Sequence, residues 1–286
     1  MAAATFSDEP GLFRSLTARP AVLAALVVFG LILVAALLAP WISPADPARM
    51  SVRARLSPPF GGAYLLGADA FGRDVLSRLL FAGRVSLSIG LGVAVVSTAL
   101  GILIGLAAGF FRRLDAPLSR LIDAMMAFPD ILLAIALVAI LGGSILNVIL
   151  ALSIVYTPRI ARIVRAATLV IRELPFVEAA RALGSSNLSI MAWHVLPNIV
   201  SPVTVQATFI FAYAMLAEAG LSFLGVGVDP SIPTWGTMVN EGRQYLDQAL
   251  YLILFPGIAI SLAVLSLQLI GDGLRDALDP RLAKDV

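Results

Sequence analysis

The chain has 286 residues, of which 59% are hydrophobic and 13% are charged, and its formal net charge is +2. A soluble domain carries about 25% charged residues, so most of this surface must face something other than water, and the lipid bilayer fits. The absence of cysteine excludes disulfides and thiolate chemistry. One histidine, His194, excludes metal sites built from several histidines, and the small net charge argues against nucleic acid as a partner.

Two apolar runs lie in the N-terminal part of the chain. Ala21–Ile42 follows a polar start that contains Arg14 and Arg19. A cleaved signal peptide has an apolar region of about 7–15 residues. Because this run is longer, we favour a retained transmembrane helix. A Pro-rich, charged segment then leaves the membrane, and the uncharged run Val85–Phe111 crosses it again, with several glycines that permit close helix packing.

The next apolar stretch, Leu121–Pro158, is too long for one crossing. As a helix it would exceed about 50 Å at about 1.5 Å per residue, against a hydrocarbon core of about 30 Å. Its turn signal is Gly142-Gly143-Ser144, which predicts two helices near 122–141 and 145–165. Two further spanning runs follow, Leu196–Leu224 and Ala249–Ile270, so we expect six spans.

The distribution of basic residues tests this topology, because cytoplasmic segments carry an excess of Arg and Lys. With both termini cytoplasmic the bias has the expected sign, although the first outer loop opposes it. The basic residues then expected inside are Arg14, Arg19, Arg112, Arg113, Arg120, Arg159, Arg162, Arg165, Arg172, Arg181, Arg275, Arg281 and Lys284.

A charged insert separates the fourth and fifth apolar runs, and its residues predict a short helix over 174–183. Pro175 suits the first turn of such a helix, and Gly184 is placed to end it. Ser185 or Ser186 can then cap a second short helix. The insert is therefore expected to form a stiff elbow that stands out of the bilayer on the cytoplasmic side.

The surface of this elbow admits two interpretations. Glu178 and Arg181 lie three residues apart and so share one helix face, while Ala179 and Ala180 leave a small surface that another protein's backbone can approach. Pro197 would re-aim the chain as it re-enters the membrane. The alternative is an interfacial helix that only joins two spans.

The spacing of the elbow residues resembles the EAA loop of bacterial ABC importer permeases. The match consists of Glu178-Ala179-Ala180, Gly184 and Leu196-Pro197. The resemblance implies an elbow that docks into a cleft of an ATP-binding subunit. The residues to which it assigns this coupling are Glu178, Ala179, Ala180, Arg181, Gly184, Leu196 and Pro197. For His194 we favour a structural role over a proton-carrying one.

A second stretch of sequence indicates which branch of the permease family the chain resembles. "LLGADAFGRDVLSRLLFAGRVSLSIG", residues 65–90, resembles the signature of peptide and nickel permeases, with Ala68 replacing the usual Thr. The similarity covers roughly residues 40–282 and implies the second, C-type membrane subunit of a dipeptide, oligopeptide or nickel importer. The implied fold is all-α, with six transmembrane helices of the type I importer class.

The same resemblance implies the organisation and the partners. Residues 1–84 would hold an N-terminal tail, the first helix and a periplasmic loop, and residues 85–286 a five-helix core with its coupling helix near 174–190. The implied partners are a second homologous permease, two ABC ATPases, an extracytoplasmic binding protein, a peptide substrate and the lipid bilayer. ATP and Mg²⁺ would be bound by the ATPases, with no cofactor held by this chain, which would lie in the bacterial inner membrane.

The first outer loop carries four candidate residues, Asp69, Gly72, Arg73 and Asp74. Arg73 and Asp74 can cap or pair along the helix that enters the second span. One interpretation is local pairing on a solvated face, worth about 0–1 kcal/mol per exposed pair. The other is a periplasmic element that contacts the binding protein or the incoming peptide.

Three acidic residues fall within or beside the spans, where charges are costly and usually face a bundle interior or water. Glu218 lies near the outer end of the fifth span, where it could line a cavity at an outer gate or bond backbone groups at the Gly220 and Gly225 breaks. Asp123 and Asp130 flank a helix break expected at Pro129. Their expected partners are Arg112, Arg113 and Arg120.

No phosphate-binding Gly-x-x-x-x-Gly-Lys-Ser/Thr motif occurs in the sequence, so we expect that this chain does not hydrolyse ATP and is not an enzyme. The function that fits is a translocation subunit that forms half of a peptide pathway. Nickel chelates and glutathione are alternative cargoes. The alternative from another class is a self-sufficient secondary transporter. Such a protein needs its own ion path, and the small number of intramembrane charges and the lack of an inverted-repeat signal argue against it.

Overall fold

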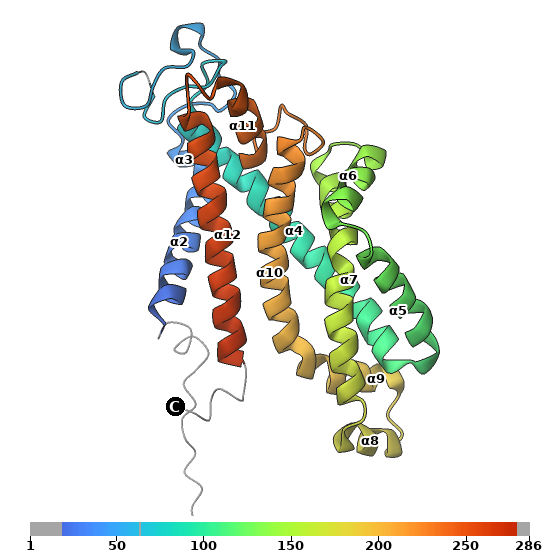
Figure 1. Cartoon of the computed structure of the whole chain (residues 1–286). Helices are drawn as coiled ribbons and strands as arrows, with labels where there is room; N and C mark the ends of the chain where they lie inside the picture. The colour runs from blue at the N-terminus through green and yellow to red at the C-terminus, as the bar shows by residue number, and fades with distance from the viewer. Residues whose placement is uncertain (1–18, 63, 279–286) are drawn as a thin grey trace, which may run out of the picture.

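The computed structural model describes residues 19–62 and 64–278 as a bundle of long helices with two short-helix regions at opposite ends (Figure 1). Most of the N-terminal tail, including Arg14, and the C-terminal residues Arg281 and Lys284 lie outside the described residues. The helices other than single turns are α2 (Pro20–Leu37), α4 (Val75–Phe110), α5 (Arg112–Met126), α6 (Asp130–Leu141), α7 (Ile145–Ile171), α8 (Pro175–Ala182), α10 (Leu196–Phe223), α11 (Trp235–Gly242) and α12 (Tyr251–Leu278).

The chain passes along the bundle six times. Five helices in the described ranges are long and apolar enough to cross a membrane, and α5 with α6 forms a bent pair that supplies the sixth pass. The start of α2 and the end of α12 lie at the same end as α8, where Arg19 pairs with Asp276 (Figure 1). We call this the elbow end, and the end that holds α11 with residues 43–62 and 64–74 the loop end. The all-α, six-pass prediction is confirmed.

The third pass starts ten residues before the span expected near 122–141, and it is broken at Pro129 as the sequence predicts. It is built from α5 and α6, whose axes are bent by 93° across the break at residues 127–129. Pro129 explains the break, because a proline disfavours helical geometry in the residue before it and donates no hydrogen bond. The turn expected at Gly142-Gly143-Ser144 is present, and Ser144 caps α7 by accepting from the Asn147 amide at 3.2 Å.

The second pass, α4, starts ten residues earlier than the expected Val85. The Asp74 carboxylate caps it by accepting from the Ser77 amide at 2.9 Å. With 36 residues, α4 is longer than a perpendicular crossing requires, and it runs diagonally across the bundle (Figure 1). The first turns of α4 carry Arg78 and Arg84, so a search for uncharged runs misses them.

Glycines on α4 allow close packing against α7. A Cβ on Gly105 would lie 2.6 Å from the Ala161 carbonyl oxygen, and one on Gly101 would lie 2.6 Å from Ile160 Cβ. Small residues let membrane helices approach closely, which replaces the hydrophobic driving force that is missing in lipid. The α4–α7 pair therefore forms the packed centre to which the elbow is attached.

Candidate functional site

The elbow begins as the sequence predicts. Pro175 occupies the first turn of α8, after Leu174 in an extended conformation. Gly184 ends the helix with φ +84°, and the amide of Ser185 donates to the Ala180 carbonyl at 3.0 Å while the Gly184 amide donates to Arg181 at 3.0 Å. This pair of bonds is the Schellman motif, for which glycine is favoured because it adopts positive φ without strain.

The second half of the elbow continues without interruption into the fifth pass. Ser186 is the capping residue, accepting from the Ser189 amide at 3.3 Å. From Asn187 to Phe223 the helix is continuous over 37 residues, so Pro197 does not start a separate element. The change of direction comes instead at a wide π-helical turn over Met191–Val195, which accommodates the amide that proline lacks.

The structure divides the elbow residues into an outward and an inward set. Glu178, Ala179 and Arg181 are exposed, whereas Ala180 is buried. The expected two-alanine contact surface is therefore wrong for Ala180, which packs with Val177 in the main apolar cluster of the protein. The outward set forms the free face of α8.

The inward set fixes the elbow to the membrane helices. Val177 and Ala180 belong to the same apolar cluster as Phe110 at the end of α4 and Ile171 at the end of α7. Arg172 adds a hydrogen bond from its Nη1 to the Gly109 carbonyl at 2.6 Å. The apolar cluster thus includes residues of α8, α4 and α7, and the Arg172 hydrogen bond ties the end of α7 to the end of α4.

Large apolar side chains are exposed around this free face. Leu183, at the end of α8, is 87% exposed, and Trp193, on the π-helical turn, is 77% exposed. His194 stacks on Phe176 with ring centroids 6.3 Å apart, which connects α8 to the π-helical turn before Leu196 and Pro197. Exposed apolar patches rimmed by polar residues mark protein contact sites.

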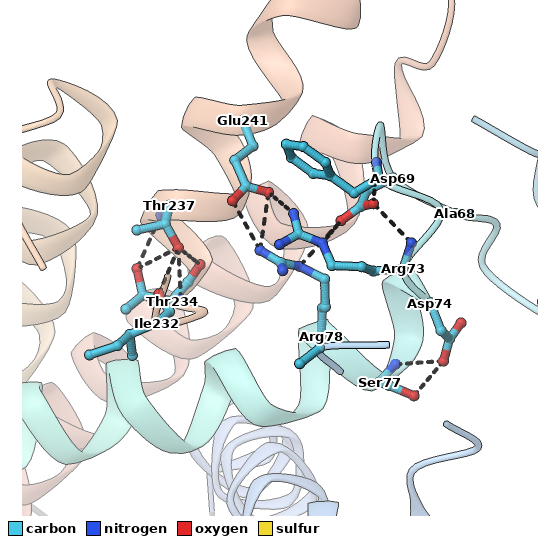
Figure 2. A network of polar contacts seen from close by, with 12 residues as sticks. Ala68, Asp69, Arg73, Asp74, Ser77, Arg78, Ile232, Thr234, Thr237 and Glu241 are labelled. Atoms are coloured by element: carbon cyan, nitrogen blue, oxygen red, sulfur yellow. Dashed lines mark hydrogen bonds and ion pairs between the residues drawn. The ribbon is translucent and has the colours of Figure 1, made fainter. Parts of the chain in front are cut away.

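At the loop end, two acids and two arginines form a buried network (Figure 2). Arg73 Nε donates to Asp69 Oδ2 at 2.5 Å, and Arg73 Nη2 donates to Glu241 Oε2 at 2.7 Å. Arg78 Nη2 reaches the same Glu241 oxygen at 3.0 Å. The interpretation of these residues as pairs on a solvated face is wrong, because Asp69 and both arginines are buried.

The other two candidates of the first outer loop have structural positions. Gly72 has φ +71°, and a Cβ there would lie 1.8 Å from the Ser51 carbonyl oxygen, so the turn requires glycine. Asp74 is 1% exposed and caps α4. Arg78 and Glu241 were not among the predicted site residues, since Glu241 lies 163 residues from Arg78 and no local signal connects them.

The loop between the fifth and sixth passes is tied to the α6–α7 turn. The Asp229 amide donates to the Gly143 carbonyl at 2.9 Å. The Asp229 carboxylate accepts from the Ser231 amide at 2.8 Å, and this hydrogen bond lowers the pKa of the Asp229 carboxyl. The turn between the third and fourth passes is thus joined to the loop between the fifth and sixth passes.

The intramembrane acids find partners other than those expected. Glu218 is fully buried and accepts from Ser222 Oγ at 2.8 Å and from Ser86 Oγ at 3.2 Å, so it bonds hydroxyl groups rather than backbone groups at the glycines. Asp123 pairs with Arg162 on α7, and Asp130 pairs with Arg159. These contacts replace the pairs expected with Arg112, Arg113 and Arg120.

The fold defines a multi-pass helical membrane protein that carries a short helical elbow at one end. Residues 98–284 match the model of the family described as "binding-protein-dependent transport system inner membrane component". Residues 12–59 match the N-terminal transmembrane domain of oligopeptide transport permease C. The chain belongs to this permease family, whose members are non-catalytic membrane subunits of ABC importers, and it is a protein of the bacterial inner membrane.

Individual proteins support the same assignment. A Brucella suis chain named as a peptide transport system permease protein is 52% identical over 94% of this chain and 90% of its own length. The di/tripeptide transport system permease protein of Pseudomonas aeruginosa is 45% identical over 94% of this chain and 91% of its own length. A chain of the inward-facing MetNI methionine ABC transporter has the same fold, with a TM-score of 0.51 and 22% identity, covering 68% of this chain and 95% of that chain.

Proposed function

We propose that this chain is one of two homologous permease subunits of an ATP-driven peptide importer and forms half of its translocation pathway. Two ATPase subunits would bind ATP and Mg²⁺ below the membrane, and an extracytoplasmic binding protein would deliver the cargo at the loop end. The elbow end is then cytoplasmic. Residues 1–84 would form a peripheral N-terminal unit and residues 85–286 the permease core, with the coupling helix inside 174–190.

The observation that carries this proposal is the combination of a free face and a fixed base in the elbow. Glu178 and Arg181 point away from the chain, while Val177 beneath them is fully buried with the ends of α4 and α7. A partner that moves the free face moves the helices. Coupling requires a contact that differs in energy between two states, and an anchored helix supplies such a contact.

Peptide cargo is supported by the names of the relatives and by the match to the oligopeptide permease domain. Glutathione is itself a peptide, and a nickel chelate would require the same permease architecture. Selection among these cargoes belongs mainly to the binding protein. Uptake of trialanine, glutathione and a nickel–histidine chelate by the reconstituted complex separates the three.

A secondary transporter is the competing class, and subunit composition discriminates it. Purification of the chain from its own membrane should bring a second permease and two ATPases with it. Uptake in proteoliposomes should require ATP and continue when the ion gradient is collapsed. Gradient-driven uptake by this chain alone would refute the importer function.

The elbow is tested by two matched pairs of variants. Glu178→Arg reverses the charge on the free face and should abolish uptake, whereas Glu173→Lys reverses an exposed acid outside α8 and should leave uptake near the wild-type level. Gly184→Val places a β-branched residue at φ +84°, whereas Gly184→Asn tolerates that conformation. Val should therefore reduce uptake far more than Asn.

All four variants should remain inserted and stay bound to the second permease, which a pull-down measures. The ATPases should be retained less well by Glu178→Arg than by Glu173→Lys. Uptake at the wild-type rate in Glu178→Arg would show that the elbow does not couple the chain to its motor.

A further inference from the structure

An ion pair lies near the middle of the membrane bundle. Arg159 is close to the centre of α7 (Ile145–Ile171), and Asp130 is the first residue of α6 after the break at residues 127–129. The Arg159 Nη2 group donates to the Asp130 carboxylate. The helix α6 is 12 residues long, so Asp130 lies about 18 Å, roughly three helical turns, from the loop end of α6.

Two tyrosines hold the arginine in place. The Arg159 guanidinium carbon lies 5.5 Å from the centroids of both the Tyr156 and the Tyr213 rings. Contacts between a guanidinium and aromatic faces are favourable, and more so where water is excluded. Arg159 therefore has partners that do not depend on Asp130, and the carboxylate can exchange its cation without leaving Arg159 unsupported.

Asp130 lies at the edge of a cavity, and its ion pair holds Arg159 beside that cavity. A cavity of about 230 Å³ is lined by Asp130, Tyr156 and Tyr213 together with apolar side chains that include Leu216. The side chains of Arg159 and Asp130 are 35% and 36% exposed. Glu218 differs, since it is fully buried among hydroxyl groups.

Exposure at this depth restricts what the cavity can face. A charged side chain at the bilayer centre is costly, and such residues face a bundle interior or a water-filled path. The surface around α6, α7 and α10 at this level is therefore turned away from lipid. In the permease pair proposed above, that surface would be the wall of the path between the two subunits.

We propose that the Asp130–Arg159 pair binds the amino-terminal residue of the peptide in transit, an inference that rests on the peptide importer function proposed above. The terminal ammonium group would replace Arg159 as the partner of Asp130. The first carbonyl oxygen, which is on the same residue of the peptide, would accept a hydrogen bond from the Arg159 guanidinium. Because it contacts only the first residue, this polar binding site would accept peptides of any length.

Charge and size both favour this occupant. An ammonium beside a carbonyl oxygen presents one cation and one acceptor, which complement a carboxylate and a guanidinium. The cavity is smaller than the about 300–1,000 Å³ of sites that enclose a whole small-molecule ligand. It fits the end of a peptide, and the apolar lining leaves the side chain of that residue without a specific requirement.

Cysteine labelling tests whether the cavity faces the path. The chain contains no cysteine, so Leu216→Cys needs no altered background in this subunit, and the unmodified chain is the blank. Ile258→Cys on α12 is the matched control, because it is 46% exposed against 53% for Leu216 and lies at a similar distance from the loop end of its helix. The probe is a membrane-impermeant methanethiosulfonate applied to the complete complex in proteoliposomes.

We expect Leu216→Cys to be labelled. When trialanine is supplied with binding protein and ATP, the labelling rate should fall about tenfold, because about 90% of the sites would then be occupied by peptide. Ile258→Cys should show no effect of trialanine. Absence of labelling at Leu216→Cys in every nucleotide state, or labelling that trialanine does not change, would overturn the proposal.

Charge exchange tests whether the pair contacts the peptide or only joins α6 to α7. Asp130→Asn should lower the maximal uptake rate about tenfold or more, since it removes a charge-assisted hydrogen bond, while the KM set by the binding protein stays unchanged. The double variant Asp130→Arg with Arg159→Asp should restore the thermal midpoint of the complex but not uptake. Recovery of wild-type uptake in the double variant would reduce the pair to a structural contact and overturn the proposal.

The two proposals fail in different ways. If the wild-type complex takes up no peptide at all, the proposed function is wrong. If the wild type transports trialanine and Asp130→Asn transports it equally fast, only the proposed binding of the peptide's amino-terminal residue by Asp130 and Arg159 is wrong.

Discussion

Arg78 on α4 and Glu241 on α11 form an ion pair with 3.0 Å between Nη2 and Oε2, although 163 residues separate them in the chain. Arg73 binds the same carboxylate, and Asp69 lies within 3.6 Å of Arg78 Nε. Two cations and two carboxylates are thereby balanced at the loop end (Figure 2). The network joins the entry of the second pass to the loop between the fifth and sixth passes.

Removing the arginine of this pair should destabilise the loop end. Arg78→Met keeps the apolar stem and removes the charge, which leaves Asp69 and Glu241 with one cation between them. Breaking a buried ion pair from one side costs about 3–5 kcal/mol, and we expect about 3 kcal/mol because the Glu241 side chain is 30% exposed. The thermal midpoint of the purified complex measures the effect.

The control is Arg84→Met on the same helix, where the arginine is exposed. Its thermal midpoint should stay within about a degree or two of the wild type, as for ordinary surface substitutions. Equal midpoints for Arg78→Met and Arg84→Met would show that the network contributes nothing to stability.

Local signals in the sequence predict the features that depend on neighbouring residues. Gly184 ends α8, Ser186 caps the helix that follows, and Gly142-Gly143-Ser144 turns the chain between α6 and α7. Each of these is decided within about one helical turn by backbone conformation or by a capping hydrogen bond. The elbow could therefore be predicted with its boundaries correct to about one residue.

Packing decides what the sequence cannot predict. Ala179 and Ala180 are identical residues, yet only Ala180 faces the core, because the direction in which α8 lies on α4 and α7 determines the buried face. Asp130 finds Arg159 instead of the arginines near 112–120 for the same reason. The bend of 93° between α5 and α6 carries Asp130 away from that basic turn and towards α7.

The contact between α4 and α7 should be sensitive to a single methyl group. Gly105→Ala would place a Cβ 2.6 Å from the Ala161 carbonyl oxygen, and the two helices would have to separate. Overpacking of this kind costs about 1–3 kcal/mol, so the thermal midpoint and the yield of inserted protein should both fall. Gly257→Ala on α12 is the matched control, since nothing lies within 4 Å of its Cβ. A fall of the same size in both variants would contradict the close-packing explanation.

The stacking of His194 on Phe176 predicts that the shape of this side chain matters more than its proton. His194→Phe preserves a planar ring beside Phe176 and should transport at nearly the wild-type rate. His194→Gln should be only slightly slower, because one stacked pair contributes about 0.5–1.5 kcal/mol. Uptake measured from about pH 6 to about pH 8 should have the same profile in all three proteins. A profile that changes in His194→Phe would assign the residue a proton-carrying role.

The contacts of Glu218 allow a structural role of this residue at the loop end to be distinguished from a gating role. Its two oxygens accept from Ser222 and Ser86, and Ser86 Oγ in turn accepts from the Trp235 amide at 3.2 Å. The carboxyl group therefore connects α10, α4 and α11 through hydroxyl groups. Because the side chain is fully buried, a peptide in the path does not reach it in this conformation.

Replacing Glu218 by Leu removes both acceptors and should cost about 1–3 kcal/mol for the polar groups left without partners. Glu218→Gln keeps one acceptor oxygen and supplies an amide that donates to the other hydroxyl, so its thermal midpoint should stay close to that of the wild type. If the residue is structural, uptake follows stability and only the Leu variant transports poorly. A Gln variant that is stable but fails to transport would show instead that the charge of Glu218 takes part in opening the loop end, since the fold would then be intact while the cycle is blocked.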